Sequence, residues 1–353
     1  MLLLGTDAAL GAGQPPLPVG QPAVGRPGLC VPGGRAEPAV PASVLSRAVA
    51  PADVEGFRPL LPVGYAAGVD AYRAAVASLS ARDLTRHYTD WLSFFHETLV
   101  PAVKARLVAL SGGAFQLDDF VAFAAGSDCD FITHLVEAVA AARGPVRIFP
   151  GDWFGFKVGC TQVETIAFDE DARGAALACL CIPSVRNGHV TEEMLTFLDG
   201  AGACLLNLNL YPTLVADERR AVAAALAPVL SKSVLSISFS RGFGLTASQL
   251  GVALVHRAHP FVARFAQAWA WHTYFFNAIA ARAFMALDLD RLAAVDDARR
   301  DWVARWLAAR DLPAPAGGSY YVRSFRCDGP LPAHLQPLAR DGVVRLCFKP
   351  PQE

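Results

Sequence analysis

The sequence predicts an α/β fold built on a mainly parallel β-sheet. Between residues 120 and 255, short apolar runs alternate with segments whose apolar residues recur at helical spacing. The apolar runs are continuous, as in 176–182, and this is typical of strands that are buried on both faces. Strands of this kind alternating with helices indicate a parallel sheet covered by helices on both sides. With 353 residues, 53% of them hydrophobic, the chain can bury a large core as one big or two medium domains.

Each predicted element follows from its local pattern. Before the sheet, residues 69–79 and 91–110 carry apolar side chains at intervals of three and four, which predicts helices. In the sheet region we expect helices at 131–141 and 192–198 and strands at 146–149, 163–168, 176–182, 204–210, 233–239 and 252–255. Beyond it we expect a long helical stretch at 261–307, broken near 287–290, then strands at 317–325 and 342–348 around a short helix near Leu335.

Composition divides the chain into four segments. Residues 1–57 are dominated by Ala, Pro, Gly and Val with little periodicity, a composition that favours a poorly ordered arm. We expect 58–122 to be a helical segment that contributes to a small domain, and 123–260 to be a large α/β domain. Residues 261–353 then supply an interdomain helix and a small α+β domain.

Charge and cysteine usage exclude several classes of function. The formal net charge is −1, so there is no broad basic field to hold a nucleic acid. No apolar run approaches the roughly 18–20 residues that span a bilayer, and the start lacks a signal-peptide pattern. We therefore expect a cytoplasmic protein without a membrane partner. The eight cysteines form no C-x-x-C pair, which favours buried thiols over a metal site.

Seven short motifs occur in an order that is specific in combination. They are Gly126-Ser127-Asp128 before a helix, the aromatic segment 149–157, the Pro/Asn/Gly segment 181–188, the segment 208–211, the Ser-x-Ser-Arg-x-x-Gly stretch within 236–251, the Gly-Gly-Ser-Tyr run 317–320, and Arg345 in Gly-Val-Val-Arg-Leu. Through these motifs the chain resembles a fold type I, class I/II aminotransferase from about Leu84 to Phe348. The resemblance implies a pyridoxal phosphate (PLP) fold, with a mainly parallel large domain and a smaller α+β domain.

The resemblance also implies roles for individual residues. Gly126, Ser127 and Asp128 correspond to the phosphate cradle at a helix N-terminus. Trp153 corresponds to the ring that stacks on pyridoxal, and Arg345 to the arginine that grips a substrate carboxylate. Further cofactor contacts are implied for Tyr88, whose counterpart reaches the neighbouring subunit's phosphate, and for Tyr211 and Ser238.

The departures from the family pattern fall on the cofactor's polar contacts. Arg241 stands where the family has its Schiff-base lysine, and Val185 stands where an asparagine contacts the pyridoxal hydroxyl. Leu208, flanked by Asn207 and Asn209, replaces the aspartate that protonates the ring nitrogen, and Gln249 replaces a phosphate-binding arginine. A shift of one residue would bring Asn207 or Asn209 to the ring, but neither is an acid.

No other lysine is a good substitute for the missing amine. The chain has only Lys104, Lys157, Lys232 and Lys349, and Lys232 lies nine residues upstream of position 241, more than about 20 Å away along a strand. A guanidinium stays protonated and delocalised, and it prefers a bidentate grip on a carboxylate or phosphate. The sequence therefore predicts an enzyme without covalent PLP.

Alternatives remain open for single residues. Trp153 could be a core aromatic, Arg241 a surface or ion-paired arginine, and Arg345 the partner of an internal carboxylate. His189 is the first histidine to consider as a catalytic acid or base, although it could be a solvated loop residue. The aromatic cluster 269–276 is expected in a core or a dimer interface.

Three functions are compatible with this pattern. The first is an enzyme that uses Arg241 and Arg345 to bind an amino acid or carboxylate, and that works without PLP or without attaching it. The second is a non-catalytic subunit that pairs with an active homologue. The third is a weak enzyme that holds PLP non-covalently. A homodimer is expected, and a heterodimer is compatible with the second function.

Overall fold

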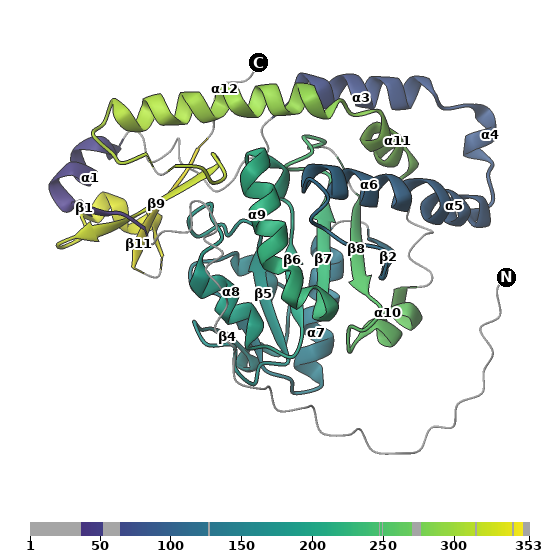
Figure 1. Ribbon diagram of the computed structural model, residues 1–353, viewed down its shortest axis with the longest axis horizontal. Helices are drawn as coiled ribbons and strands as arrows, with labels where there is room; N and C mark the ends of the chain where they lie inside the picture. Colours follow the sequence, from purple (N-terminus) through teal and green to yellow (C-terminus); the bar gives the residue numbers. More distant parts are fainter. Residues whose placement is uncertain are drawn as a thin grey trace.

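The computed structural model describes residues 37–51, 64–125, 128–246, 248, 250–269, 277–314, 316–340 and 342–348 (Figure 1). The described chain contains a seven-stranded sheet and a four-stranded sheet. A long helix, α12 (Leu289–Ala308), runs across the molecule from the smaller sheet to the helices above the larger one (Figure 1).

The large sheet has the strand order β2-β8-β7-β6-β5-β3-β4. Its strands are β2 (Phe120–Ala125), β3 (Val146–Ile148), β4 (Ile166–Phe168), β5 (Leu177–Cys181), β6 (Cys204–Asn207), β7 (Ser233–Ser238) and β8 (Gly251–His256). The neighbours from β4 through β7 pair in parallel, whereas β8 pairs antiparallel with both β7 and β2. The predicted mainly parallel α/β fold is therefore confirmed.

Helices cover both faces of this sheet, because its central strands are apolar on both sides. In β5, Leu177 and Cys179 pack in one core cluster while Ala178 and Leu180 pack in the other. Helix α7 (Asp128–Ala141) covers the first face, and α8 (Glu192–Asp199) and α9 (Ala216–Leu226) cover the second. All five β5 residues are buried.

The small sheet has the order β1-β9-β11-β10. Its strands are β1 (Ala39–Pro41), β9 (Val322–Asp328), β10 (Ala339–Arg340) and β11 (Val343–Cys347). The expectation that 1–57 is a poorly ordered arm is wrong for 37–51, because β1 pairs in parallel with β9 and helix α1 (Ala42–Ala48) follows it. Val40 and Leu45 bury apolar side chains there, which a composition dominated by Ala, Pro and Gly does not reveal.

The remaining helices lie before and after the large sheet. They are α3 (Ala66–Ala77), α4 (Ala81–Leu84), α5 (Tyr88–Phe94), η2 (Phe95–Leu99), α6 (Val100–Leu110), α10 (Val262–Trp269) and α11 (Ala278–Ala286). Short helical turns are η3 (Phe154–Lys157), η4 (Val163–Thr165), η5 (Tyr211–Thr213), η6 (Ala227–Lys232) and η8 (Ala333–Leu338). The expected break near 287–290 is confirmed at Asp288, whose side chain accepts from the amides of Asp290 and Arg291 and begins α12.

Three predicted strands are clearly shorter than expected, and one of them is the segment 204–210, which ends as a strand at Asn207. The segment 163–168 begins with the helical turn η4, and only 166–168 joins the sheet. The segment 317–325 becomes a strand only at Val322, because Gly317 and Gly318 have φ values of 73° and 77°. Such left-handed backbone is incompatible with a continuing strand.

A buried polar network joins α3, α12 and the approach to β9. The Tyr65 and Tyr320 hydroxyls each lie 2.7 Å from Oδ1 of Asp296 and 2.9 Å from one another. Arg299 donates to the carbonyl of Gly64 and lies over the Tyr65 ring. These buried hydrogen bonds fix α12 in position against the start of α3 and the segment before β9.

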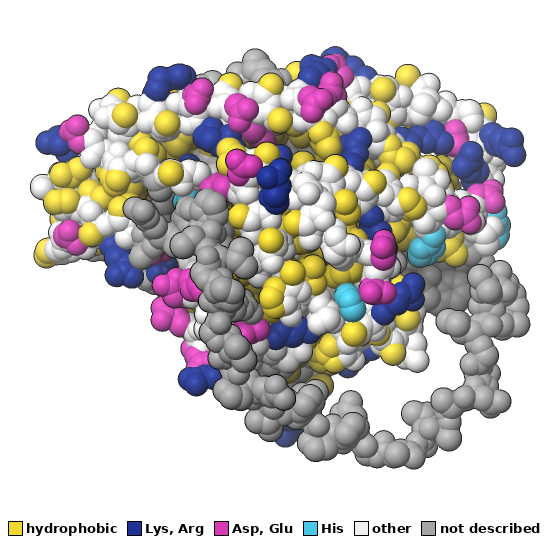
Figure 2. Space-filling model, viewed as in Figure 1, with side chains coloured by type: hydrophobic (Ala, Val, Ile, Leu, Met, Phe, Trp, Pro, Cys, Tyr) yellow, Lys and Arg dark blue, Asp and Glu magenta, His cyan; other side chains and the backbone are white. Residues whose placement is uncertain are grey.

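Basic and acidic side chains are interspersed over the face shown in Figure 2. Within the described ranges, no helix is both long and apolar enough to cross a membrane. The same residues contain no group of three or more His, Cys, Asp or Glu side chains placed to hold a metal ion.

Candidate functional site

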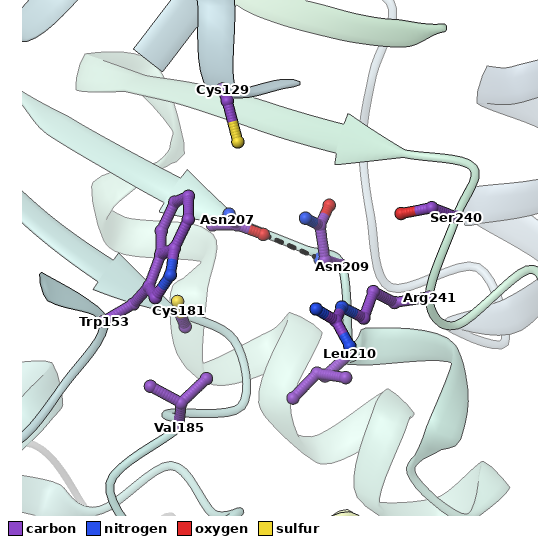
Figure 3. Close-up of a pocket in the computed structure, with 9 residues that line it drawn as sticks. All are labelled: Cys129, Trp153, Cys181, Val185, Asn207, Asn209, Leu210, Ser240 and Arg241. Atoms are coloured by element: carbon purple, nitrogen blue, oxygen red, sulfur yellow. Dashed lines mark hydrogen bonds between the residues drawn. The ribbon is translucent and has the colours of Figure 1, made fainter. Parts of the chain in front are cut away.

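A cavity of about 160 Å³ lies at the carboxyl ends of the parallel strands β5, β6 and β7 (Figure 3). This edge is where open α/β sheets bind ligands. Each strand contributes its last residue or the loop that follows. The residues that line the cavity are Cys129, Trp153, Cys181, Val185, Asn207, Asn209, Leu210, Ser240 and Arg241.

Arg241 and Trp153 lie on opposite sides of this cavity, so the structure brings together two residues that the sequence singled out (Figure 3). Both side chains are partly buried. Trp153 begins the turn η3 and packs edge-on against Phe156, with ring centroids 5.2 Å apart. An aromatic wall faces a cation across the cavity.

The turn that carries Arg241 is tied to the end of β6 by Asn209. The Asn209 side-chain oxygen accepts from the amide of Ser238 at 2.7 Å, and its carbonyl accepts from the amide of Gly242 at 2.8 Å. A Cβ at position 242 would lie 2.6 Å from Cδ of Pro212 and 2.8 Å from the Asn209 carbonyl oxygen. Only glycine can follow Arg241 without moving this turn.

Two asparagine side chains, Asn207 and Asn209, line the cavity between Trp153 and Arg241 (Figure 3). Asn207 is the last residue of β6, and its Oδ1 accepts from the backbone amide of Asn209 at 2.9 Å (Figure 3). Leu208, which the resemblance matched to the family aspartate, is 1% exposed and does not line the cavity. The end of β6 and the turn that follows it therefore present Asn207, Asn209 and Leu210 to the cavity, while Leu208 packs in the core.

Arg345 approaches the cavity from the small sheet without lining it. Its Nη1 donates to the Val185 carbonyl at 3.1 Å, and its side chain is half-buried. Within the part of the chain that the structure describes, no Asp or Glu forms an ion pair with Arg345. The guanidinium thus lies just behind the 184–189 loop that forms the Val185 wall.

Two predicted site residues, Tyr211 and Ser238, do not line the cavity. Tyr211 is fully buried, and its hydroxyl donates to the Arg219 carbonyl at 2.8 Å. Ser238 shares a 2.7 Å hydrogen bond with Ser240, which does line the cavity. Sequence spacing could not place these side chains, because it does not specify which way the residues after a strand turn.

His189 is buried, so the expectation of a solvated loop residue is wrong. It is 6% exposed, and a Cβ on Gly318 would come within 2.5 Å of its ring. Burial, together with the Arg323 charge, lowers the His189 pKa to about 4, so the imidazole is neutral near pH 7. His189 does not line the cavity, and this position argues against its predicted role as a catalytic acid or base.

Several predicted residues lie outside the described residues. These are Gly126, Ser127, Gln249, Lys349 and all but the first residue of the aromatic cluster 269–276. Asp128 begins α7 and Tyr88 begins α5, but their side chains are also outside the described set. Their predicted roles stay predictions.

The three described lysines make their contacts elsewhere. Nζ of Lys104 donates to the Phe120 carbonyl at 2.7 Å, and Lys157 lies 5.0 Å from the Phe168 ring centroid. Lys232 donates to two carbonyls near the end of α8. None of these three lines the cavity.

The structure adds residues that sequence reasoning missed. Cys129 and Cys181 line the cavity, and the Cys129 sulfur points into it (Figure 3). Cys181 ends β5, and Cys129 lies in the first turn of α7 directly after the motif 126–128. The sequence could have indicated both cysteines, because Cys129 directly follows the motif 126–128 and Cys181 begins the motif 181–188.

Comparison with known structures defines the class of fold. The chain is similar to histidinol-phosphate aminotransferase from Sinorhizobium meliloti, solved in complex with pyridoxal 5′-phosphate, with a TM-score of 0.52 and 17% identity over 82% of this chain and 84% of that one. It is also similar to histidinol-phosphate aminotransferase from Clostridium acetobutylicum, with a TM-score of 0.56 and 10% identity over 83% and 93% of the two chains. L-threonine-O-3-phosphate decarboxylase from Porphyromonas gingivalis has a TM-score of 0.55 and 14% identity over 82% and 94%.

The fold is that of the fold type I PLP-dependent aminotransferases. At these identities the likeness extends to the fold alone. No family model of protein sequences matches this chain, and no curated protein matches its sequence.

Proposed function

We propose that this protein is an aminotransferase-fold enzyme that binds a small amino acid or carboxylate at Arg241 and does not attach PLP covalently. The observation that carries the proposal is the position of Arg241. It lines a cavity at the carboxyl ends of β5, β6 and β7, opposite Trp153, in the place that the sequence resemblance gives to the Schiff-base lysine. At that position the side chain can therefore bind an anion, but it cannot form an imine.

The described residues suit an anionic ligand. Among those that line the cavity there is one cation and no carboxylate, while Asn207, Asn209 and Ser240 are uncharged polar groups. A guanidinium in a partly buried cavity pairs with a carboxylate through two parallel hydrogen bonds. Arg345, behind the Val185 wall, adds a second positive charge near the cavity without lining it.

The same residues do not fit covalently attached PLP. An imine needs a primary amine, and the three described lysines contact Phe120, Phe168 and the carbonyls that follow α8. The cavity also presents Asn207, and no acid, as a group that could contact the pyridine nitrogen of PLP. Without a basic amine or a protonating acid, conventional transamination lacks both its anchor and its proton acceptor.

We further propose that the protein is a cytoplasmic homodimer and that its ligand is a small molecule. The proposal of a homodimer rests on analogy with fold type I proteins. We propose that its substrate is an amino- or carboxylate-containing small molecule.

Calorimetric titration with 2-oxoglutarate and L-glutamate tests the Arg241 site. We expect one of these probes to bind the wild type, and Arg241→Ala to weaken binding roughly 10- to 100-fold, because a charge-assisted hydrogen bond contributes about 1.5–3 kcal/mol. Arg173→Ala is the matched control, since Arg173 is exposed and pairs with Asp171. Equal affinities for the wild type and Arg241→Ala would contradict the proposal.

Titration with PLP separates the two alternatives. A weak enzyme that holds PLP non-covalently should gain a visible pyridoxal band in the wild type, whereas the proposed enzyme should gain it only after Arg241→Lys. A non-catalytic subunit should bind neither PLP nor the carboxylate probes. It should instead form a stable complex with an active aminotransferase of the same cell, as measured by size-exclusion chromatography.

A further inference from the structure

Behind the aromatic wall of the cavity lies a carboxylate that the sequence motifs do not assign. Asp152 precedes Trp153, and it is 2% exposed. Its Oδ1 accepts from the Trp153 amide at 2.6 Å, and its Oδ2 accepts from the Cys181 amide at 2.9 Å. One buried side chain therefore joins the loop after β3 to the end of β5.

These two amides belong to two walls of the cavity. Trp153 forms the aromatic side, and Cys181 is the last residue of β5 (Figure 3). The turn before Asp152 is itself closed, because the Asp152 amide donates to the Phe149 carbonyl at 3.0 Å and Gly151 has a φ of 76°. The loop thus arrives at Asp152 in a defined conformation and is then fixed to β5 through the carboxylate.

The uncharged amide side chain of asparagine cannot reproduce this bridge. A carboxylate presents an acceptor on both oxygens, so it can receive two N–H groups at once. Asparagine of the same shape places an NH₂ group against one of the two amides, and leaves that buried N–H without an acceptor. The two contacts therefore specify an acid at this position.

We propose that Asp152 is a positioning residue that holds the Trp153 ring and the end of β5 in the geometry that receives the ligand, a role that rests on the proposed function of the cavity. It acts through the backbone of Trp153 and Cys181 and does not line the cavity itself. Charged and titratable groups around it are Cys179 and Cys181 of β5 and the Arg186 guanidinium, which binds Glu37 and the Pro150 carbonyl.

The state of Asp152 supports this role. Burial raises its pKa to about 6, while the hydrogen bonds from Cys181 and Trp153 act in the opposite direction. The carboxylate form that accepts both amides therefore predominates at neutral pH, and protonation near pH 6 removes one acceptor.

The first test needs no ligand. The emission of Trp153 is obtained as the difference between the wild type and Trp153→Phe, and again between Asp152→Asn and the double variant. We expect the second difference spectrum to be shifted to the red and more strongly quenched by acrylamide, because a released indole contacts more water. Superimposable difference spectra would overturn the positioning role whether or not the cavity binds a carboxylate.

The second test measures binding of 2-oxoglutarate and L-glutamate by calorimetry. Asp152→Asn should weaken whichever probe the wild type binds by about tenfold, since one lost hydrogen bond to a charged group contributes about 1.5 kcal/mol. Asp296→Asn is the matched control, because Asp296 is a buried carboxyl that accepts two side-chain hydroxyls far along α12. Equal weakening by both variants would indicate a general loss of stability and would overturn the proposal.

If Asp152→Asn does not fold, the wild type and Trp153→Phe together still decide the question. The Trp153 difference emission, recorded from pH 5 to pH 8, should change with a midpoint near 6 and should not follow the far-ultraviolet circular dichroism. A difference emission that is flat over this range would reject the role of the carboxylate.

Discussion

Replacing Gly242 with alanine should both destabilise the protein and weaken ligand binding. The new Cβ would lie 2.6 Å from Pro212 Cδ and 2.8 Å from the Asn209 carbonyl oxygen, so the turn must shift. That shift lengthens the 2.8 Å hydrogen bond from the Gly242 amide to the same carbonyl. Overpacking a tight site costs about 1–3 kcal/mol and a lost hydrogen bond about 1 kcal/mol, so we expect a loss of about 2–3 kcal/mol.

Thermal unfolding followed by circular dichroism measures this loss. A chain of this size loses about 1.4 °C per kcal/mol, so the Gly242→Ala melting temperature should fall by roughly 3–4 °C. Gly64→Ala is the matched control, because a Cβ at Gly64 meets no atom within 4 Å. Because Arg241 is the preceding residue, the affinity of Gly242→Ala for the carboxylate probe should fall too. An unchanged melting temperature, or an equal fall in Gly64→Ala, would refute the steric argument.

Two further predictions concern buried polar groups. Tyr320→Phe removes a hydroxyl that lies 2.7 Å from Asp296, so it should lower the melting temperature more than Tyr321→Phe, whose hydroxyl makes a longer 3.4 Å contact with Tyr65; equal losses would contradict this. Burial lowers the pKa of His259 to about 4, below its unfolded value, so its contribution to stability is present above about pH 6.5 and is lost as the pH falls towards 4. His259→Asn should therefore show a smaller fall in melting temperature between pH 7 and pH 4.5, and a fall equal to that of the wild type would disprove this.

Much of the fold could be predicted because each strand carries its own signal. The run at β5 is apolar at every position, and this requires two covered faces wherever the strand is placed. The break before α12 could be predicted because Asp288 is a local capping residue. The strand β1 could not, since its stability comes from pairing with β9, nearly 290 residues further along the chain.

The candidate site was predicted only in part. Arg241 and Trp153 were found because each lies within a motif whose order along the chain is informative. Leu208 was matched one residue away from Asn207, because a motif specifies neither where a strand ends nor which way its last side chains point. The burial of His189 could not be predicted, since it depends on the close approach of Gly318 from the turn that precedes β9.

The sequence by itself determined the alternating series of apolar strands and helices, and it placed a guanidinium at position 241 within a recognisable motif. Only the tertiary structure decided which groups surround that guanidinium. Cys129, Trp153 and Arg241 are far apart in the chain, and they line one cavity because β2, β3 and β7, which precede them, run in the same direction and end at one edge of the sheet. The same holds for Asp152: the sequence gives the acidic side chain, but only the fold brings the Cys181 amide to it beside the amide of Trp153.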